Sequence, residues 1–244
     1  AAGAASASKV GALTGLDEAG WRNLAAAYPA LPNDPGRAAA RRKAKLIRLA
    51  SRALATGRWD LRLEGDPPGP EPCVYVTAHI GSMQALRYAL RARGVPAATV
   101  LGPHNLDRAQ AIPQDRVFDR RYALDFPHAL PSSATHRLRS ALKRGSLVVA
   151  GDLPERGGVL AKILGGPALL DPRPFRLARV AQALCRPAFA TLPEGRWTLT
   201  LGPVLEGDEL ACAEAFGRVF ARVAKAAPLD IDGVVYAYRA GQAR

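Results

Sequence analysis

The sequence predicts an α/β protein: a single domain with a mostly parallel central sheet flanked by helices. Short apolar segments with a strand-like pattern alternate with segments of helical periodicity along most of the chain. Of the 244 residues, 48% are hydrophobic, which is enough for one domain with a sizeable core. The alternation favours parallel strands, because each helix carries the chain back to start the next strand in the same direction.

The chain is predicted to consist of an N-terminal segment, residues 1–36, and the α/β domain, residues 37–240. The domain is expected to begin with a basic amphipathic helix at about 37–56, after the breaker sequence PNDPG. Arg41 and Lys45 begin a basic stripe at helical spacing, opposite a stripe of Leu and Ala. Such a helix can lie on an anionic membrane surface or present a solvated basic face over ordinary core packing.

The elements that follow are placed by periodicity and by turn residues. Ser132 or Ser133 is expected to cap the helix that runs to Arg144, and Gly145 is expected to end it. The segment 104–130 is polar and irregular. The predicted strands are 59–63, 73–77, 97–101, 146–150, 187–191 and 196–201, and the predicted helices are 81–93, 132–144, 171–184 and about 210–223.

Two polar residues directly follow strands of the predicted sheet. His79 comes after the strand CVYVT, and Asp152 comes after the strand SLVVA. Ligands of parallel sheets bind beyond the carboxyl ends of the strands, so both side chains are expected on one rim. A histidine there can take a proton from a hydroxyl if a nearby group fixes its tautomer. Gly81 permits a tight turn into the next helix, from which Gln84 is expected to fold back toward the imidazole.

Around His79 the chain reads HIGSMQ. This resembles the signature of the lipid A biosynthesis acyltransferases, which is His, four residues, then Glu or Asp. These are the late acyltransferases of the lysophospholipid acyltransferase superfamily. The similarity continues in the same order through LGPHN, LKRGSLVVAGDLPERGG, GGPALLDPRPFRLARVAQALCRPAFA and RWTLTLGPVLEG, over roughly residues 40–240.

The resemblance implies a glycerol-3-phosphate/lysophospholipid acyltransferase-like fold and a specific reaction. A fatty acyl group would move from an acyl-carrier-protein or coenzyme A thioester to a hydroxyl of a lipid, glycan or similar acceptor. His79 would act as the general base, and Asp152 would have a structural or acceptor-positioning role. Arg116 is the nearest match to the basic residue that holds the oxyanion, with two alternates nearby. The substrate-binding residues implied in this way are Gly81, Ser82, Asn105, Arg116, Arg120 and Arg121.

The chain departs from the signature at Gln84, which replaces the acidic residue. The amide oxygen can accept a ring N–H and keep the tautomer, but it carries no negative charge. Three interpretations follow. Another carboxylate, such as that of Asp152, faces His79; or the protein performs slow or altered chemistry; or it is a catalytically silent homologue that binds an acyl carrier or lipid, or supports an active partner.

The net charge of +13 indicates an anionic partner, although an arginine-rich proteome would produce the same excess. Nucleic acid, an acidic membrane surface, and phosphate-bearing substrates or acidic carrier proteins are the classes to weigh. An aromatic content of 6% and the absence of nucleic-acid-binding motifs argue against nucleic acid. The expected partners are an acyl-ACP or acyl-CoA donor, a hydroxyl acceptor and an anionic membrane surface.

The cysteines Cys73, Cys185 and Cys212 are odd in number, far apart and set in apolar sequence. Their spacing is not typical of zinc or iron–sulfur sites, so we expect no metal and buried, reduced thiols in a cytoplasmic protein. The acyl donor carries its own activation, so no bound cofactor is expected either. Peripheral contact with the inner face of the cell membrane is a further expectation.

Overall fold

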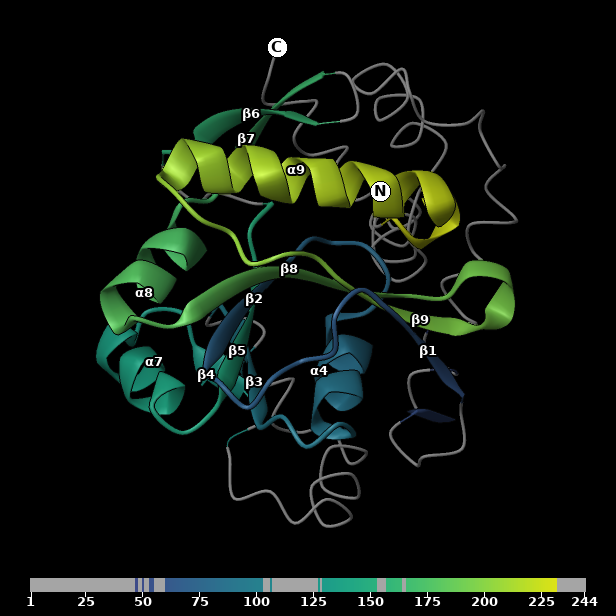
Figure 1. Cartoon of the computed structure of the whole chain (residues 1–244), viewed down its shortest axis with the longest axis horizontal. Coiled ribbons are helices and arrows are strands. Elements are labelled where there is room, and N and C mark those ends of the chain that lie inside the picture. The colour runs from purple at the N-terminus through teal and green to yellow at the C-terminus, as the bar shows by residue number, and fades with distance from the viewer. Residues whose placement is uncertain are drawn as a thin grey trace, which may run out of the picture.

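The computed structural model describes residues 47, 50, 53–54, 60–102, 106, 127, 129–152, 157–163 and 166–231. The central sheet has seven strands in the order β1-β9-β8-β2-β5-β3-β4 (Figure 1). Its strands are β1 (Leu61–Glu64), β2 (Cys73–Thr77), β3 (Ala97–Leu101), β4 (Ala129–Pro131), β5 (Ser146–Ala150), β8 (Leu184–Thr191) and β9 (Trp197–Leu201).

Most neighbours in this sheet are parallel. The five strands from β8 to β4 run in one direction, whereas β9 is antiparallel to β8 and β1 is parallel to β9. A separate antiparallel hairpin consists of β6 (Val159–Ile163) and β7 (Gly166–Leu170). The mostly parallel α/β fold predicted from the sequence is therefore confirmed.

Helices cover both faces of the sheet. They are α4 (Met83–Arg91), α7 (Thr135–Leu142), α8 (Arg173–Ala181) and α9 (Glu209–Ala226), with short 3₁₀ turns at Pro193–Gly195 and Pro228–Asp230. Helices α7, α8 and α9 pack in one hydrophobic cluster, and α4 packs in the other with Ala50 and Leu54. In Figure 1, α9 and α4 accordingly lie on opposite sides of the long strand β8.

Alternation along the central strands explains this two-sided core. In β2, Val74 and Val76 belong to the cluster with α9, whereas Cys73 and Tyr75 belong to the cluster with α4. Successive side chains of a strand point to opposite faces, so a strand buried on both faces needs apolar residues at every position. All five residues of β2 are buried, which makes it the centre of the fold.

Most predicted elements agree with the structure, although several details were wrong or missing, among them β4, which begins in the segment predicted to be irregular. The strands at 73–77, 97–101 and 146–150 are confirmed without change. Helix α7 begins at Thr135 with Ala134 at its N-cap, so neither Ser132 nor Ser133 caps it as predicted. The antiparallel β9 and the β6–β7 hairpin were not anticipated, because nothing in an apolar strand pattern states the direction or partner of that strand.

The N-terminal predictions lie almost entirely outside the described residues. Of the basic helix at about 37–56, only Ile47, Ala50, Ala53 and Leu54 are described, and these are helical. Ala50 and Leu54 are buried, in agreement with an apolar stripe facing the core. The domain boundaries at 36 and 240 stay predictions. Among the helices that the structure describes, none is long and apolar enough to cross a membrane.

All three cysteines are buried and reduced, as predicted. Burial raises the pKa of the Cys73 thiol to about 12, and burial also raises the pKa values of Cys185 and Cys212. A thiol reacts as its thiolate, and a raised pKa removes the thiolate near neutral pH. These side chains therefore serve as packing groups and not as nucleophiles.

We expect the native protein to react with a thiol reagent at about pH 8 roughly 100-fold more slowly than the unfolded protein. The reason is that Cys73 is both inaccessible and protonated in the fold. Spectroscopic thiol titration with and without urea measures the difference, and the urea sample is its own control. Rapid labelling of Cys73 in the native protein, detected by mass spectrometry, would contradict this expectation.

Candidate functional site: a histidine–aspartate pair beside an apolar cavity

The pairing of two central strands brings His79 and Asp152 together. Strands β2 and β5 are parallel neighbours, and Thr77 is the register partner of Ala150. His79 and Asp152 each lie two residues beyond this last pair, so they leave the sheet side by side at its carboxyl edge. The sequence placed both residues on one rim, and the strand register makes them direct neighbours.

The side chain of Asp152 holds His79 at two points. The ring nitrogen Nδ1 lies 2.9 Å from Asp152 Oδ1, and the backbone N–H of His79 donates to Asp152 Oδ2 at 2.8 Å. A carboxylate can only accept, so the proton of the neutral imidazole lies on Nδ1 and the lone pair lies on Nε2. The Asp152 side chain is 2% exposed and that of His79 is 27% exposed, so the carboxylate is buried behind an accessible ring.

The loop that carries His79 is held from the opposite side by β8 and by the segment after α9. Gly81 N donates to the carbonyl of Asp230 at 2.7 Å, and Ser82 N donates to the carbonyl of Ala190 at 3.0 Å. The Asp230 carboxylate in turn accepts from the backbone N–H of Leu192 at the end of β8. Asp230 was not identified from the sequence, because no local pattern links it to a loop so far away in the chain.

The remaining predicted residues near His79 have local structural contacts. Ser82 is the N-cap of α4, and its hydroxyl accepts from Ala85 N at 3.1 Å. Gln84 donates from Nε2 to the hydroxyl of Tyr88 at 2.8 Å, one helical turn further along α4. The carboxylate on the imidazole thus comes from Asp152 and β5. Of the predicted substrate-binding residues, Asn105, Arg116, Arg120 and Arg121 lie outside the described residues.

A cavity of about 460 Å³ opens beside the histidine. His79 lines it at the sheet rim, between the ends of β3 and β5 and the helices α7 and α8. More than half of its lining is apolar, and this apolar part consists of Met83, Val100, Leu101, Leu138, Val149, Ala150, Pro174, Leu177 and Val180. This cavity could not be located from sequence, because its walls come from five separate elements.

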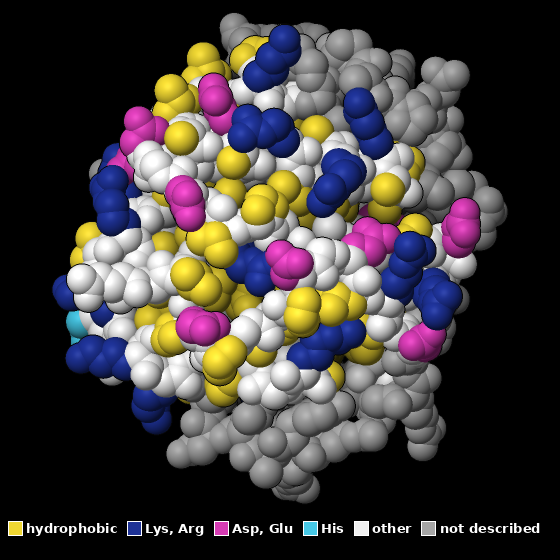
Figure 2. Space-filling view, in the orientation of Figure 1, with side chains coloured by type: hydrophobic (Ala, Val, Ile, Leu, Met, Phe, Trp, Pro, Cys, Tyr) yellow, Lys and Arg dark blue, Asp and Glu magenta, His cyan; other side chains and the backbone are white. Residues whose placement is uncertain are grey.

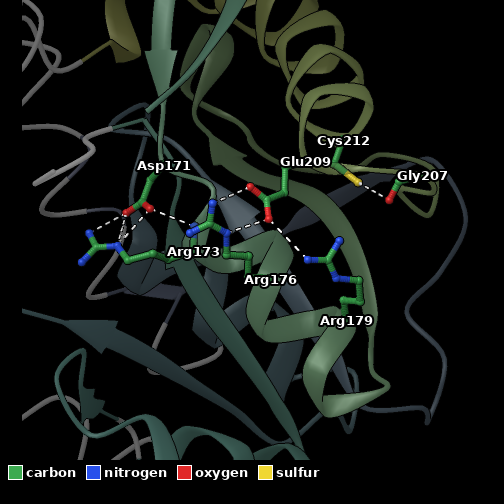
Figure 3. Close-up of polar contacts among 7 residues, drawn as sticks. All are labelled: Asp171, Arg173, Arg176, Arg179, Gly207, Glu209 and Cys212. Atoms are coloured by element: carbon green, nitrogen blue, oxygen red, sulfur yellow. Dashed lines mark hydrogen bonds and ion pairs between the residues drawn. The ribbon is translucent and has the colours of Figure 1, made fainter. Parts of the chain in front are cut away.

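Three arginines line the same cavity: Arg139, Arg173 and Arg176. Arg173 contacts the carboxylate of Asp171 at 2.6–2.9 Å. Arg176 forms two hydrogen bonds, of 2.6 and 2.8 Å, with Glu209 at the start of α9, and they lower the pKa of that carboxyl. Figure 3 shows these contacts, of which the one between Arg176 and Glu209 joins α8 to α9 beside the cavity. Sequence analysis missed this group, although Arg173 and Arg176 have the i, i+3 spacing of one helix face.

On the visible face of the molecule, the positive charge of the described residues does not gather in one patch (Figure 2). On the face shown in Figure 2, Lys and Arg side chains are spread among Asp, Glu and exposed hydrophobic side chains. The arginines at the cavity are therefore informative because of where they lie, and not because of the net charge of +13.

No model of a known protein family matches the chain, and no curated protein matches it either. Among solved structures, it is similar to the 1-acyl-sn-glycerophosphate (LPA) acyltransferase PlsC from Thermotoga maritima. That likeness has a TM-score of 0.44 and 15% sequence identity, and it covers 84% of this chain and 85% of that chain. A likeness this distant assigns no activity. The chain is an α/β protein with a histidine–aspartate pair at the rim of its sheet.

We expect Gly81→Ala to destabilise the protein by about 2–4 kcal/mol. Gly81 has a φ of +65°, and a Cβ there would lie 1.9 Å from the carbonyl oxygen of Ala190. Urea unfolding measures the loss. Gly94→Ala is the matched control, because Gly94 has a φ of +78° with nothing within 4 Å of the added Cβ. The Gly94→Ala variant should lose only about 1 kcal/mol of unfolding free energy, because only the left-handed backbone conformation disfavours the added Cβ there. Equal losses in both variants would show that the clash does not constrain the loop.

Proposed function

We propose that the protein is an O-acyltransferase. It moves a fatty or related acyl group from an acyl-carrier-protein or coenzyme A thioester to a hydroxyl of a lipid, glycan or similar acceptor. The observation that carries the proposal is the His79–Asp152 pair, whose accessible ring lines an apolar cavity. The resemblance of HIGSMQ and of the segments after it to the late acyltransferases supports the same reaction.

The geometry suits general base catalysis by His79. With its proton on Nδ1 directed at Asp152, the ring offers Nε2 to a substrate hydroxyl. Nε2 takes the hydroxyl proton while the oxygen attacks the thioester carbonyl carbon. The carbon–sulfur bond then breaks, and the proton on Nε2 passes to the leaving sulfur. The products are the acylated acceptor and a free thiol, and the ring returns to its starting state.

Asp152 supplies the negative charge that Gln84 lacks. As Nε2 takes the proton the ring becomes a cation, and a buried carboxylate 2.9 Å from Nδ1 stabilises that cation. The same contact fixes the tautomer, so one residue serves both purposes. The amide at position 84 therefore does not require a silent protein.

The cavity suits the acyl chain of the donor. Its volume of about 460 Å³ lies within the range of about 300–1,000 Å³ that is typical of small-molecule sites. Each buried methylene group contributes about 0.8 kcal/mol, so a chain lying along Leu138, Val149 and Leu177 would be bound without polar contacts. The thioester end would then lie at His79, where the chemistry occurs.

His79→Ala and Asp152→Asn should each lower the rate of acyl transfer by about 10²–10⁴-fold. The first variant removes the base, and the second removes the carboxylate charge that stabilises the imidazolium and fixes the tautomer of the ring. Initial rates with a long-chain acyl thioester and a lipid hydroxyl acceptor measure both. Asp60→Asn is the control, since Asp60 is an exposed partner of Arg196 and does not line the cavity.

Two results would overturn this assignment. An activity that persists after His79→Ala would refute the mechanism. A silent wild-type protein that gains activity on Gln84→Glu would instead favour the catalytically silent homologue, which binds an acyl carrier or lipid without turnover.

Leu177→Trp should shift the donor preference toward shorter acyl chains. Leu177 is half-buried and lines the cavity from α8, so a larger side chain fills space that a long chain would occupy. We expect kcat/KM to fall about tenfold for long-chain donors and to change little for short ones. Leu184→Trp, outside the cavity lining, is the control. A uniform loss across all chain lengths would place the acyl chain elsewhere.

A further inference from the structure

Three of the polar residues that line the cavity come from a single segment of the chain. Ser132 follows β4, and Thr135 and Arg139 lie four residues apart in α7, so they share one face of the helix. Side chains of a helix lean toward its N-terminus, which directs Arg139 over the turn that contains Thr135. Two hydroxyl groups and one guanidinium therefore line the cavity from the same wall.

The charge of Arg139 is not balanced by a neighbouring carboxylate in the part of the chain that the structure describes. Arg173 is paired with Asp171 and Arg176 with Glu209, whereas no ion pair joins Arg139 to any described residue. The sequence from 129 to 151 contains no Asp or Glu at all. Arg139 is exposed, so its charge is available to a bound molecule.

The N-terminus of α7 adds a favourable field for an anion to the charge of Arg139. Ala134 occupies the N-cap, and within the described residues no side chain caps the helix. Its first turn contains no acidic residue either. The free N–H groups and the dipole of an uncapped helix N-terminus favour an anion. Here they coincide with Arg139 and two cavity-lining hydroxyls, which makes the site more specific than a helix end alone.

We propose that Ser132, Thr135 and Arg139 bind the phosphate group of a phosphate-bearing substrate whose apolar chain lies in the same cavity. This inference rests on the proposed function, because it assigns the polar part of a substrate to the site that holds its acyl part. A guanidinium and hydroxyl donors match the oxygen atoms of a phosphate ester. Such a phosphate belongs either to the donor, on its pantetheine arm, or to a lipid acceptor.

The test compares Arg139→Ala with Arg137→Ala. Arg137 is an exposed arginine on the same helix that does not line the cavity, so it controls for general charge. In the donor arm, long-chain acyl-CoA is compared with the acyl N-acetylcysteamine thioester, which has no phosphate. In the acceptor arm, lysophosphatidic acid is compared with monoacylglycerol.

Arg139→Ala should raise KM by about 10- to 100-fold for the phosphate-bearing compound of one arm, with little change in kcat. The phosphate-free compound of that arm should be unaffected, and the arm that responds identifies the source of the phosphate. Arg139→Lys should recover part of the affinity, because a lysine keeps the charge but not the two-pronged geometry. Equal losses with and without phosphate, or an equal loss in Arg137→Ala, would overturn the proposal.

Calorimetric binding of the same four compounds to His79→Ala protein separates this inference from the proposed function. Binding that depends on Arg139 and on phosphate, in a protein whose wild type transfers no acyl group, would keep the phosphate site and reject the acyltransferase. Acyl transfer by the wild-type protein, with binding that does not depend on Arg139, would keep the acyltransferase and reject the phosphate site.

Discussion

The hydrogen bonds between Asp152 and His79 depend on the register of β2 against β5. Gly151 allows the two strands to approach closely at this point, since an added Cβ would lie 2.7 Å from Val76 Cγ1. Gly151 N still donates to the Thr77 carbonyl at 2.8 Å, so the strands stay joined up to the residue before Asp152. A slip of one residue would turn the carboxylate to the other face of the sheet. In β5, Leu147 packs in the cluster with α9 and Val148 in the cluster with α4, so that slip would exchange side chains of different size between two closely packed cores.

The histidine is fixed more firmly than the rest of the site. Its ring and backbone are bound by Asp152, and the loop after it is bound by the carbonyls of Ala190 and Asp230. The cavity walls, in contrast, combine the ends of β3 and β5 with helices that pack through side chains and through ion pairs such as Arg176 with Glu209. A rigid base beside a more adaptable apolar wall suits a reaction in which one proton position must be constant while acyl chains differ in shape.

The sequence predicted the features that depend on local residue patterns, namely the central strands and the residues at their carboxyl ends. The strands around β2 appear as short apolar runs, and the residues just after them fall at the carboxyl edge, so His79 and Asp152 could be placed on one rim. Their direct contact could not be derived, because it joins residues 73 positions apart and depends on the strand order. The same holds for Asp230, which reaches Leu192 across 38 positions. The expectation that Gln84 folds back toward the ring rested on its place in the first turns of the helix, and the structure shows its amide donating to the Tyr88 hydroxyl one turn further along α4.

The position of the carboxylate also accounts for the amide at position 84. A buried carboxylate is stable only when its charge is matched by donors, and Asp152 has two of them in the ring and the backbone N–H of His79. The side chain of Gln84, in the first turn of α4, donates to the hydroxyl of Tyr88. The buried carboxylate that the imidazole needs is therefore supplied by Asp152. The replacement that first suggests a lost activity is thus compatible with a site whose acid comes from a neighbouring strand.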